Sequence, residues 1–264
     1  MQPNSMTTVE KAPGESRHFT LRGRTGAVMD LLLDRPEDGE GKIPLVIILH
    51  GLTGFKEEAH LAALARKLRL SHFAALRADL YGHGAGGGLF RDHTLQKWVA
   101  EIRQLIDEAR TCGQYSQIFL CGHSQGALCA LLAAGEEPEH VSGVIALAPA
   151  LRIPAKARSG TLFDLSFDPA HIPEELTVWG RPLSAEYVRL AQTVREEAIT
   201  AYPGPVLLIH SDTDERVPLS VSEEAAARFP QARLIVTHGD THDFDRHPDE
   251  MAEAAVNWLQ QAAI

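Results

Sequence analysis

Short apolar runs alternate along this chain with longer stretches in which apolar residues recur every three or four positions. The runs lie at 45–49, 73–78, 118–121, 144–147, 206–209 and 234–236. The stretches with a helical period lie at 57–70, 94–109, 125–134, 219–228 and 248–262. A run that is apolar on both faces is typical of a strand buried inside a parallel sheet. The alternation therefore predicts an α/β fold with a mostly parallel, doubly wound sheet.

Two further strands are expected near the N-terminus, at 17–24 and 27–33, with Gly26 in the turn between them. The short connection predicts an antiparallel hairpin at one edge of the sheet. With the six apolar runs, this makes a sheet of about eight strands. Residues 1 to about 16 are polar and contain two prolines, so we expect a loose N-terminal arm there.

The alternation breaks between residues 151 and 202. This stretch contains several prolines, scattered aromatic residues and one helical pattern, which predicts a helix over 184–200. We interpret residues 1–150 and 203–264 as the core of the fold, and residues 151–202 as an inserted cap subdomain that lies over the sheet.

Composition narrows the classes of protein that fit this fold. The chain has 264 residues and a formal net charge of −10, which argues against binding to nucleic acid or to an anionic membrane surface. No apolar run is long enough to span a membrane, and the N-terminus lacks the pattern of a secretory signal. The three cysteines show no metal-type spacing, so reduced cysteines in the cytoplasm are expected.

The strongest chemical motif is Gly122-His123-Ser124-Gln125-Gly126, which follows an apolar strand and precedes a helix. This is the context that the G-x-S-x-G signature requires. A serine on so sharp a turn has its hydroxyl exposed, and neighbouring glycines avoid steric clashes. Ser124 is therefore the predicted nucleophile, and the amide of Gln125 is a predicted oxyanion donor.

A serine nucleophile needs a base, and the base needs an acid that orients it. The strand at 206–209 runs into a loop with two acids, Asp212 and Asp214. The layout resembles the H-G-x-x-D-x-x-V-P loop of serine hydrolases, with Ser211 in place of glycine, and this alignment favours Asp214. Asp212 then has the role of a turn or cap carboxylate.

The loop after the last strand contains two histidines, His238 and His242. His242 is the predicted base because it matches the pattern G-x-x-H-x-F, whereas His238 lies closer to the strand and fits a structural role. The same loop is rich in potential metal ligands up to His247. Its glycine and its many polar residues indicate that this segment is a loop and not a helix. The potential ligands then do not share one helix face, so no metal is expected. The amide of Leu52, after the strand at 45–49, is the predicted second oxyanion donor.

These pieces together resemble the α/β-hydrolase superfamily and, within it, the bacterial cinnamoyl (feruloyl) esterases. The resemblance runs from about residue 17 to 260 and includes two segments of the insertion. The matching segments are 50–54, 79–84, 122–126, 147–150, the loops of Asp214 and His242, 168–173 and 187–192.

The resemblance implies hydrolysis of a small-molecule ester through an acyl-enzyme, with no cofactor. It also implies that Tyr187 helps to hold the ring of the acyl group, and family members often form homodimers. Phe163 and His123 are further candidate substrate-binding residues. In the family, an acid and an amide side chain bind the hydroxyl groups on the ring of the acyl group. This chain has Ala155-Lys156 and Phe163 at the corresponding places, which predicts a preference for less hydroxylated acyl groups.

Three functions are compatible with this pattern. The first is a carboxylesterase for hydroxycinnamoyl or other aryl esters, which the aromatic cap favours. The second is a monoacylglycerol lipase-like or short-chain acyl esterase, which the loss of hydroxyl partners favours. The third, a non-catalytic binding protein with this fold, would be indicated by a broken triad, yet every triad position is filled. Peptidase and haloperoxidase chemistry also occur on this fold.

Overall fold

The structure is a computed structural model that describes residues 16–37 and 41–263. The predicted N-terminal arm therefore lies almost entirely outside the described residues. Eight strands form one sheet in the order β1-β2-β4-β3-β5-β6-β11-β12. Their bounds are β1 (Arg17–Arg22), β2 (Val28–Asp34), β3 (Ile43–Leu49), β4 (Ala74–Asp79), β5 (Tyr115–His123), β6 (Gly143–Leu147), β11 (Val206–Ser211) and β12 (Ala232–Thr237).

The predicted sheet is confirmed in its number of strands and in their mostly parallel directions. β1 and β2 form an antiparallel hairpin at one edge, with Gly26 at a φ of 87° in the turn. β2 also pairs with β4 in antiparallel register, and all later neighbours are parallel. The carboxyl ends of the parallel strands consequently meet at one edge, where sheets of this type place their sites.

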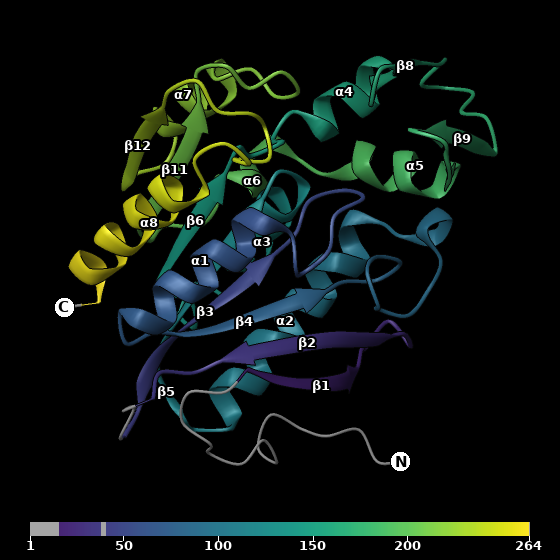
Figure 1. The fold of residues 1–264 in the computed structure, drawn as a ribbon. Helices are drawn as coiled ribbons and strands as arrows, with labels where there is room; N and C mark the ends of the chain where they lie inside the picture. The colour runs from purple at the N-terminus through teal and green to yellow at the C-terminus, as the bar shows by residue number, and fades with distance from the viewer. Residues whose placement is uncertain (1–15, 38–40, 264) are drawn as a thin grey trace.

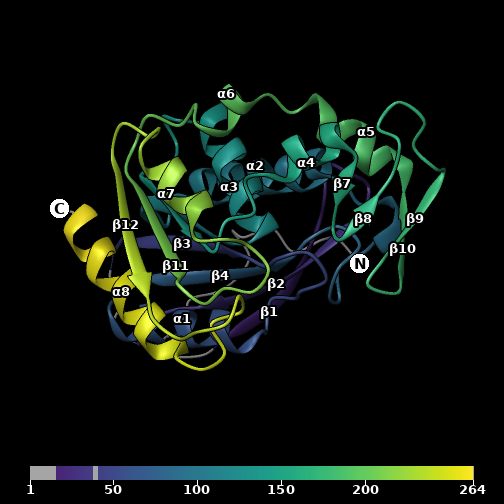
Figure 2. The same cartoon turned by 90° about the horizontal axis from the view of Figure 1, so that it is seen from above.

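Helices cover both faces of the sheet (Figures 1 and 2). The larger ones are α1 (Ala59–Leu70), α2 (Leu95–Thr111), α3 (Gln125–Glu136), α7 (Ser220–Ala226) and α8 (Pro248–Ala262). Leu45, Ile47 and Leu49 of β3 belong to the apolar cluster that contains α2 and α3. Val46 and Ile48 belong to the opposite cluster, which contains α1 and α8. The continuous apolar run of β3 is therefore explained by burial on both faces.

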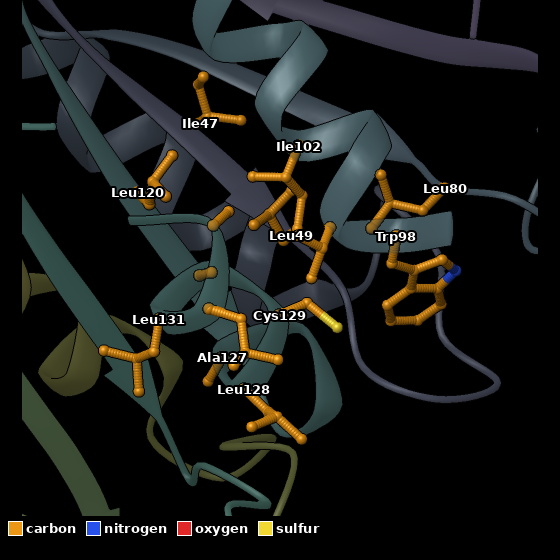
Figure 3. Close-up of a cluster of buried hydrophobic side chains, with 14 of the residues drawn as sticks. Ile47, Leu49, Leu80, Trp98, Ile102, Leu120, Ala127, Leu128, Cys129 and Leu131 are labelled. Atoms are coloured by element: carbon orange, nitrogen blue, oxygen red, sulfur yellow. The ribbon is translucent and has the colours of Figure 1, made fainter. Parts of the chain in front are cut away.

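The cluster on the α2–α3 face includes the first turns of α3, the helix that begins directly after Ser124. Figure 3 shows Trp98 and Ile102 from α2 beside Leu49 from β3, with Leu128 and Cys129 from α3 below them. All five side chains are buried. Such close packing fixes the start of α3 relative to the strand ends, because a shift of either would open a void.

Residues 151–202 hold short elements at the carboxyl edge of the sheet (Figure 1). They are α4 (Ile153–Ser159), β7 (Thr161–Leu162), β8 (Leu165–Ser166), β9 (Glu175–Val178), β10 (Arg181–Ser184), α5 (Ala185–Thr193) and α6 (Glu196–Ile199). β7 with β8 and β9 with β10 form two small hairpins that the sequence pattern did not predict. The status of this stretch as a separate cap subdomain stays a prediction.

The single helix predicted over 184–200 is wrong, because the chain is extended at Val194 and Arg195 between α5 and α6. The side chain of Arg158 donates hydrogen bonds to the carbonyls of Gln192 and Val194. These bonds satisfy backbone acceptors at the end of α5 and hold the chain where the helix stops. Glu196 and Glu197 then lie in the first turn of α6, where negative charge is favourable.

Within residues 16–37 and 41–263, none of the helices has both the length and the apolar character that crossing a membrane requires. The longest of the helices named above, α2, has 17 residues and a strongly polar outer face.

A buried ionic cluster anchors the loop after β3 to the neighbouring strands. The ammonium of Lys56 lies 2.6 Å from an oxygen of Asp30 on β2 and 2.8 Å from an oxygen of Asp79 on β4. Asp79 also accepts hydrogen bonds from the backbone amides of Lys56 and Ala85. Gly84 is required beside it, since a Cβ there would lie 2.2 Å from the Asp79 carboxyl carbon. The cluster ties the loops at 50–58 and 80–88 to the sheet.

We expect Lys56→Met to lower the free energy of unfolding by about 3–5 kcal/mol, because it removes the buried cation that the carboxylates of Asp30 and Asp79 share. The matched control is Lys67→Met, which breaks an exposed pair with Glu253 and should cost about 0–1 kcal/mol. Urea unfolding monitored by circular dichroism measures both. Equal effects of the two substitutions would show that the buried cluster does not hold the loop.

Candidate active site

Ser124 occupies the sharp turn between β5 and α3. Its backbone has φ 52° and ψ −116°, a strained conformation for a residue with a side chain. The flanking glycines are required by space: a Cβ on Gly122 would lie 2.4 Å from the Gly126 carbonyl oxygen, and one on Gly126 would lie 2.3 Å from the His50 carbonyl oxygen. The predicted context of strand, turn and helix is therefore present, and it presents the serine at the carboxyl edge of the sheet.

His242 and Asp214 form a hydrogen-bonded pair close to this turn. The Nδ1 atom of His242 lies 2.7 Å from Oδ2 of Asp214, and Nε2 of His210 lies 3.1 Å from the same oxygen. The other oxygen, Oδ1, accepts hydrogen bonds from the backbone amides of Arg216 and Val217. Since Nδ1 of His242 is engaged by Asp214, Nε2 remains as the nitrogen that can exchange a proton with another group.

The electrostatics of Asp214 suit an orienting acid. Burial by itself raises the pKa of its carboxyl, but hydrogen bonds from His210 and His242 outweigh burial and hold the pKa well below its usual range. The side chain is fully buried, so water does not compete for these contacts. Asp214 consequently stays ionised over the whole neutral range.

Asp212, the alternative acid, faces away from this pair. Its carboxylate lies 2.7 Å from Nδ1 of His238 and accepts a hydrogen bond from the amide of Gly239. The side chain of His238 is 81% exposed, so the two form a surface pair. Asp240 is buried and accepts hydrogen bonds from the backbone amides of Thr241, Arg246 and His247. These acids thus shape the loop that carries His242.

A cavity of about 510 Å³ connects the predicted residues. Ser124, His242, Gln125, Leu52, His123 and Phe163 all line it. Its remaining wall combines the aromatic ring of Trp179 with charged side chains, among them Arg152, Lys156 and Arg216. Acidic side chains, among them Glu58, Glu215 and Asp243, also line it, so the cavity offers apolar surface and charges of both signs next to the serine, a suitable combination for a small ligand with an aromatic and a polar part.

The loop of Leu52 is pressed against the nucleophile turn. A Cβ on Gly51 would lie 3.2 Å from Cβ of Ser124, so a larger residue would force one of them to shift by a few tenths of an ångström. The imidazole of His50 fixes the loop: the Leu80 amide donates to its Nε2, which leaves Nδ1 to donate to the carbonyl of Gly51. Burial lowers the pKa of His50, which keeps the ring in the neutral form that these two bonds require. The roles of the Leu52 and Gln125 amides as oxyanion donors stay predictions.

Tyr187 is not among the residues that line this cavity. It is completely buried, and its hydroxyl donates a 2.7 Å hydrogen bond to Oε1 of Gln125. The centroid of its ring lies 5.8 Å from that of Phe163, which does line the cavity. The structure thus places Tyr187 behind the wall, where it connects α5 to the start of α3. Its contact with a substrate ring stays a prediction.

Comparison with known proteins places the chain in a family. Residues 42–174 match the family model described as serine aminopeptidase, S33, and residues 183–263 match that of TAP-like proteins. No curated protein matches the chain. A structure of Est1E from Butyrivibrio proteoclasticus with ferulic acid bound is 40% identical, with a TM-score of 0.89 over 94% of this chain and 99% of that one. The chain belongs to the α/β-hydrolase family.

Two further structures are similar to this chain. Another structure of Est1E from Butyrivibrio proteoclasticus is 38% identical, with a TM-score of 0.86 over 94% of this α/β-hydrolase and 98% of that chain. Alpha/beta hydrolase domain-containing protein 10 from mouse is 18% identical, with a TM-score of 0.73 over 93% of this chain and 99% of that one, and shows the fold alone. The predicted resemblance to α/β-hydrolase esterases is thereby confirmed.

Sequence reasoning missed several residues of this α/β-hydrolase site. His210 contacts Asp214, and its position four residues before the acid at the end of a strand was the available signal. Glu58 lines the cavity, and burial together with the nearby charge of Asp243 raises the pKa of Glu58 to about 7. Trp179 lies in the turn of the β9–β10 hairpin, which the sequence pattern did not predict, and its side chain lines the cavity.

Proposed function

We propose that this α/β-hydrolase cleaves carboxylic esters through an acyl-enzyme on Ser124, with hydroxycinnamoyl or similar aryl esters as substrates. The observation that carries the proposal is that His242, which is hydrogen-bonded to buried Asp214, lines the same cavity as Ser124. A histidine held in this way acts as a general base toward a serine. The strained turn makes the hydroxyl accessible to an ester that enters the cavity.

In this mechanism, Oγ of Ser124 attacks the ester carbonyl carbon while Nε2 of His242 takes its proton. The negative oxygen of the tetrahedral intermediate accepts hydrogen bonds from the amides of Leu52 and Gln125. Collapse breaks the bond to the alcohol, which leaves with the proton from His242. Water then attacks the acyl-enzyme and gives a proton to His242; collapse breaks the bond to Oγ of Ser124, which takes this proton back as the acid leaves. Asp214 stabilises the imidazolium that forms twice in this cycle.

Two observations support an aromatic acyl group. The rings of Phe163 and Trp179 both line the cavity, with centroids 5.7 Å apart. A similar chain, Est1E from Butyrivibrio proteoclasticus, has been solved with ferulic acid bound. Lys156 and Phe163, which stand where the esterase family offers partners for ring hydroxyls, also line the cavity. We therefore propose that unsubstituted cinnamoyl esters are turned over at least as well as feruloyl esters.

A peptidase is the second candidate, because one matching family model is described as serine aminopeptidase, S33. An ester is the easier substrate for a serine nucleophile of this kind, although acidic side chains in the cavity wall, among them Glu58, Glu215 and Asp243, suit an N-terminal amine. A lipase-like hydrolase of aliphatic esters is the third. A cytoplasmic location and a homodimer stay predictions.

The test compares kcat/KM for methyl cinnamate, methyl ferulate, aliphatic esters of increasing chain length and an aminoacyl p-nitroanilide. We expect the aryl esters to exceed the aliphatic esters by about tenfold or more, since filling an apolar aromatic pocket contributes about 1–3 kcal/mol to transition-state binding. Faster turnover of aliphatic esters would overturn the aryl assignment, and faster turnover of the anilide would favour the peptidase.

A further inference from the structure

Three side chains with metal-binding atoms converge behind the nucleophile turn. Glu58 is the N-cap residue of α1, His60 is the second residue of that helix, and His123 is the last residue of β5. One potential ligand atom from each of the three lies within 4.8 Å of the others. The rings of His60 and His123 contact each other, with centroids 4.6 Å apart. This cluster is separate from the loop at 238–247, the only place where the sequence suggested metal ligands.

The hydrogen bonds around His123 determine which of its nitrogens has a free lone pair. Nε2 lies 3.0 Å from the carbonyl oxygen of His242. A carbonyl can only accept, so Nε2 bears the hydrogen and donates it. Nδ1 of the neutral ring is then a lone-pair acceptor. It is buried and has no hydrogen-bond partner among the residues that the structure describes.

The other two residues add buried polar atoms that also lack partners among the described residues. Within the described part of the chain, Oε2 of Glu58 and Nε2 of His60 are also buried without a hydrogen-bond partner. A buried acceptor without a donor costs about 1–3 kcal/mol, and more if it is charged. A cation can accept lone pairs from the Glu58 carboxylate, from Nδ1 of His123 and from Nε2 of His60 in the tautomer that has its hydrogen on Nδ1.

The surrounding backbone is shaped to leave room for these side chains. A Cβ on Gly54 would lie 2.6 Å from Oε2 of Glu58, and a Cβ on Gly51 would lie 3.0 Å from Nδ1 of His123. The carboxylate of Asp243 lies 3.8 Å from Nε2 of His123 and adds negative charge to the surroundings. Glu58 lines the active-site cavity, which provides a path of entry for a small ion.

We propose that Glu58, His60 and His123 form a binding site for a divalent transition metal ion of the Zn²⁺ type. Two imidazole nitrogens and one carboxylate oxygen are a donor set that zinc prefers, and a fourth position is left for water. The proposal does not depend on the proposed esterase reaction, because its readout is binding of the metal. The proposed metal site is connected to the active site through His123. This residue is the last one of β5, directly precedes Ser124, and donates a hydrogen bond to the backbone carbonyl of His242.

The test is calorimetric titration of the full chain, stripped with a chelator, with ZnCl₂. We expect one Zn²⁺ per chain and a rise in melting temperature with zinc concentration, because the ion binds the folded state. His60→Gln removes one ligand and should weaken the binding by about 100-fold or more. Glu58→Gln keeps the shape of the side chain and should weaken zinc binding to a similar extent. If one variant does not fold, the other still tests whether the site binds zinc.

Two controls separate this site from other potential zinc ligands. His140→Gln alters the partly exposed group of Glu137, Glu139 and His140 and should leave the stoichiometric binding unchanged. His242→Gln removes a ligand from the alternative group of His123, His242 and Asp243 and should also leave it unchanged. The proposal is overturned if the wild-type chain binds no stoichiometric zinc, or if His242→Gln abolishes binding while His60→Gln and Glu58→Gln do not.

Discussion

Ser124→Ala is expected to lower kcat for ester hydrolysis by on the order of 10⁶-fold, as loss of the nucleophile does in serine hydrolases of this kind. The hydroxyl at the turn is the group that forms the acyl-enzyme, and alanine cannot replace it. The variant should fold normally, because alanine keeps the Cβ, and the Ser124 side chain does not cap α3. What remains is catalysis by the oxyanion donors and by substrate binding.

The measurement combines steady-state turnover of methyl cinnamate with labelling by a fluorophosphonate, which reacts covalently with an activated serine. Both should be lost in Ser124→Ala. Thr53→Ala is the matched control, because it removes another hydroxyl from the wall of the same cavity and should retain turnover and labelling. Substantial hydrolysis by purified Ser124→Ala, at an unchanged melting temperature, would refute the acyl-enzyme mechanism.

Asp214→Asn is expected to lower kcat by about 10⁴-fold. Asparagine has nearly the same shape, but its amide nitrogen donates hydrogen bonds and cannot accept one from Nδ1–H of His242. The imidazole then adopts the wrong tautomer, and the positive charge that it gains during catalysis is no longer compensated. His210, which shares the same carboxylate oxygen at 3.1 Å, loses its contact as well.

Asp212→Asn is the control for this prediction, since Asp212 lies in the same loop but pairs with exposed His238. We expect its kcat to stay within about threefold of wild type, as is usual for a surface substitution worth less than about 0.5 kcal/mol. The ratio of kcat between the two variants measures which acid orients His242. Similar losses in both would contradict the assignment of Asp214 and point to a general effect on the loop.

Several features of the fold could be predicted from local sequence because they depend on short periods. An apolar run such as 45–49 becomes a strand buried on two faces, and the observed β3 spans Ile43–Leu49 with side chains in both clusters. The role of Gly122 and Gly126 could be predicted from the sequence because only glycine fits on either side of so sharp a turn. The chain order of serine, acid and histidine followed from the same local patterns.

Other features were decided by contacts between distant parts of the chain. The helix predicted over 184–200 is interrupted because Arg158, more than 30 residues earlier, binds the carbonyls at the end of α5. Tyr187 could be placed on a helix from its spacing, but only packing against α3 turned its hydroxyl to Gln125 instead of into the cavity. Helical periodicity indicates which face is buried, not which polar group it contacts.

The sequence by itself thus determined the sheet, the nucleophile turn and the candidates for acid and base, because backbone sterics and burial leave a strong local signal. Tertiary structure decided which candidates meet. It paired His242 with Asp214 and left Asp212 at the surface. It also brought Glu58 and His60 to His123, since the parallel pairing of β3 with β5 aligns loops that are distant in sequence. Side-chain hydrogen bonds of this kind depend on three-dimensional register, which no local period encodes.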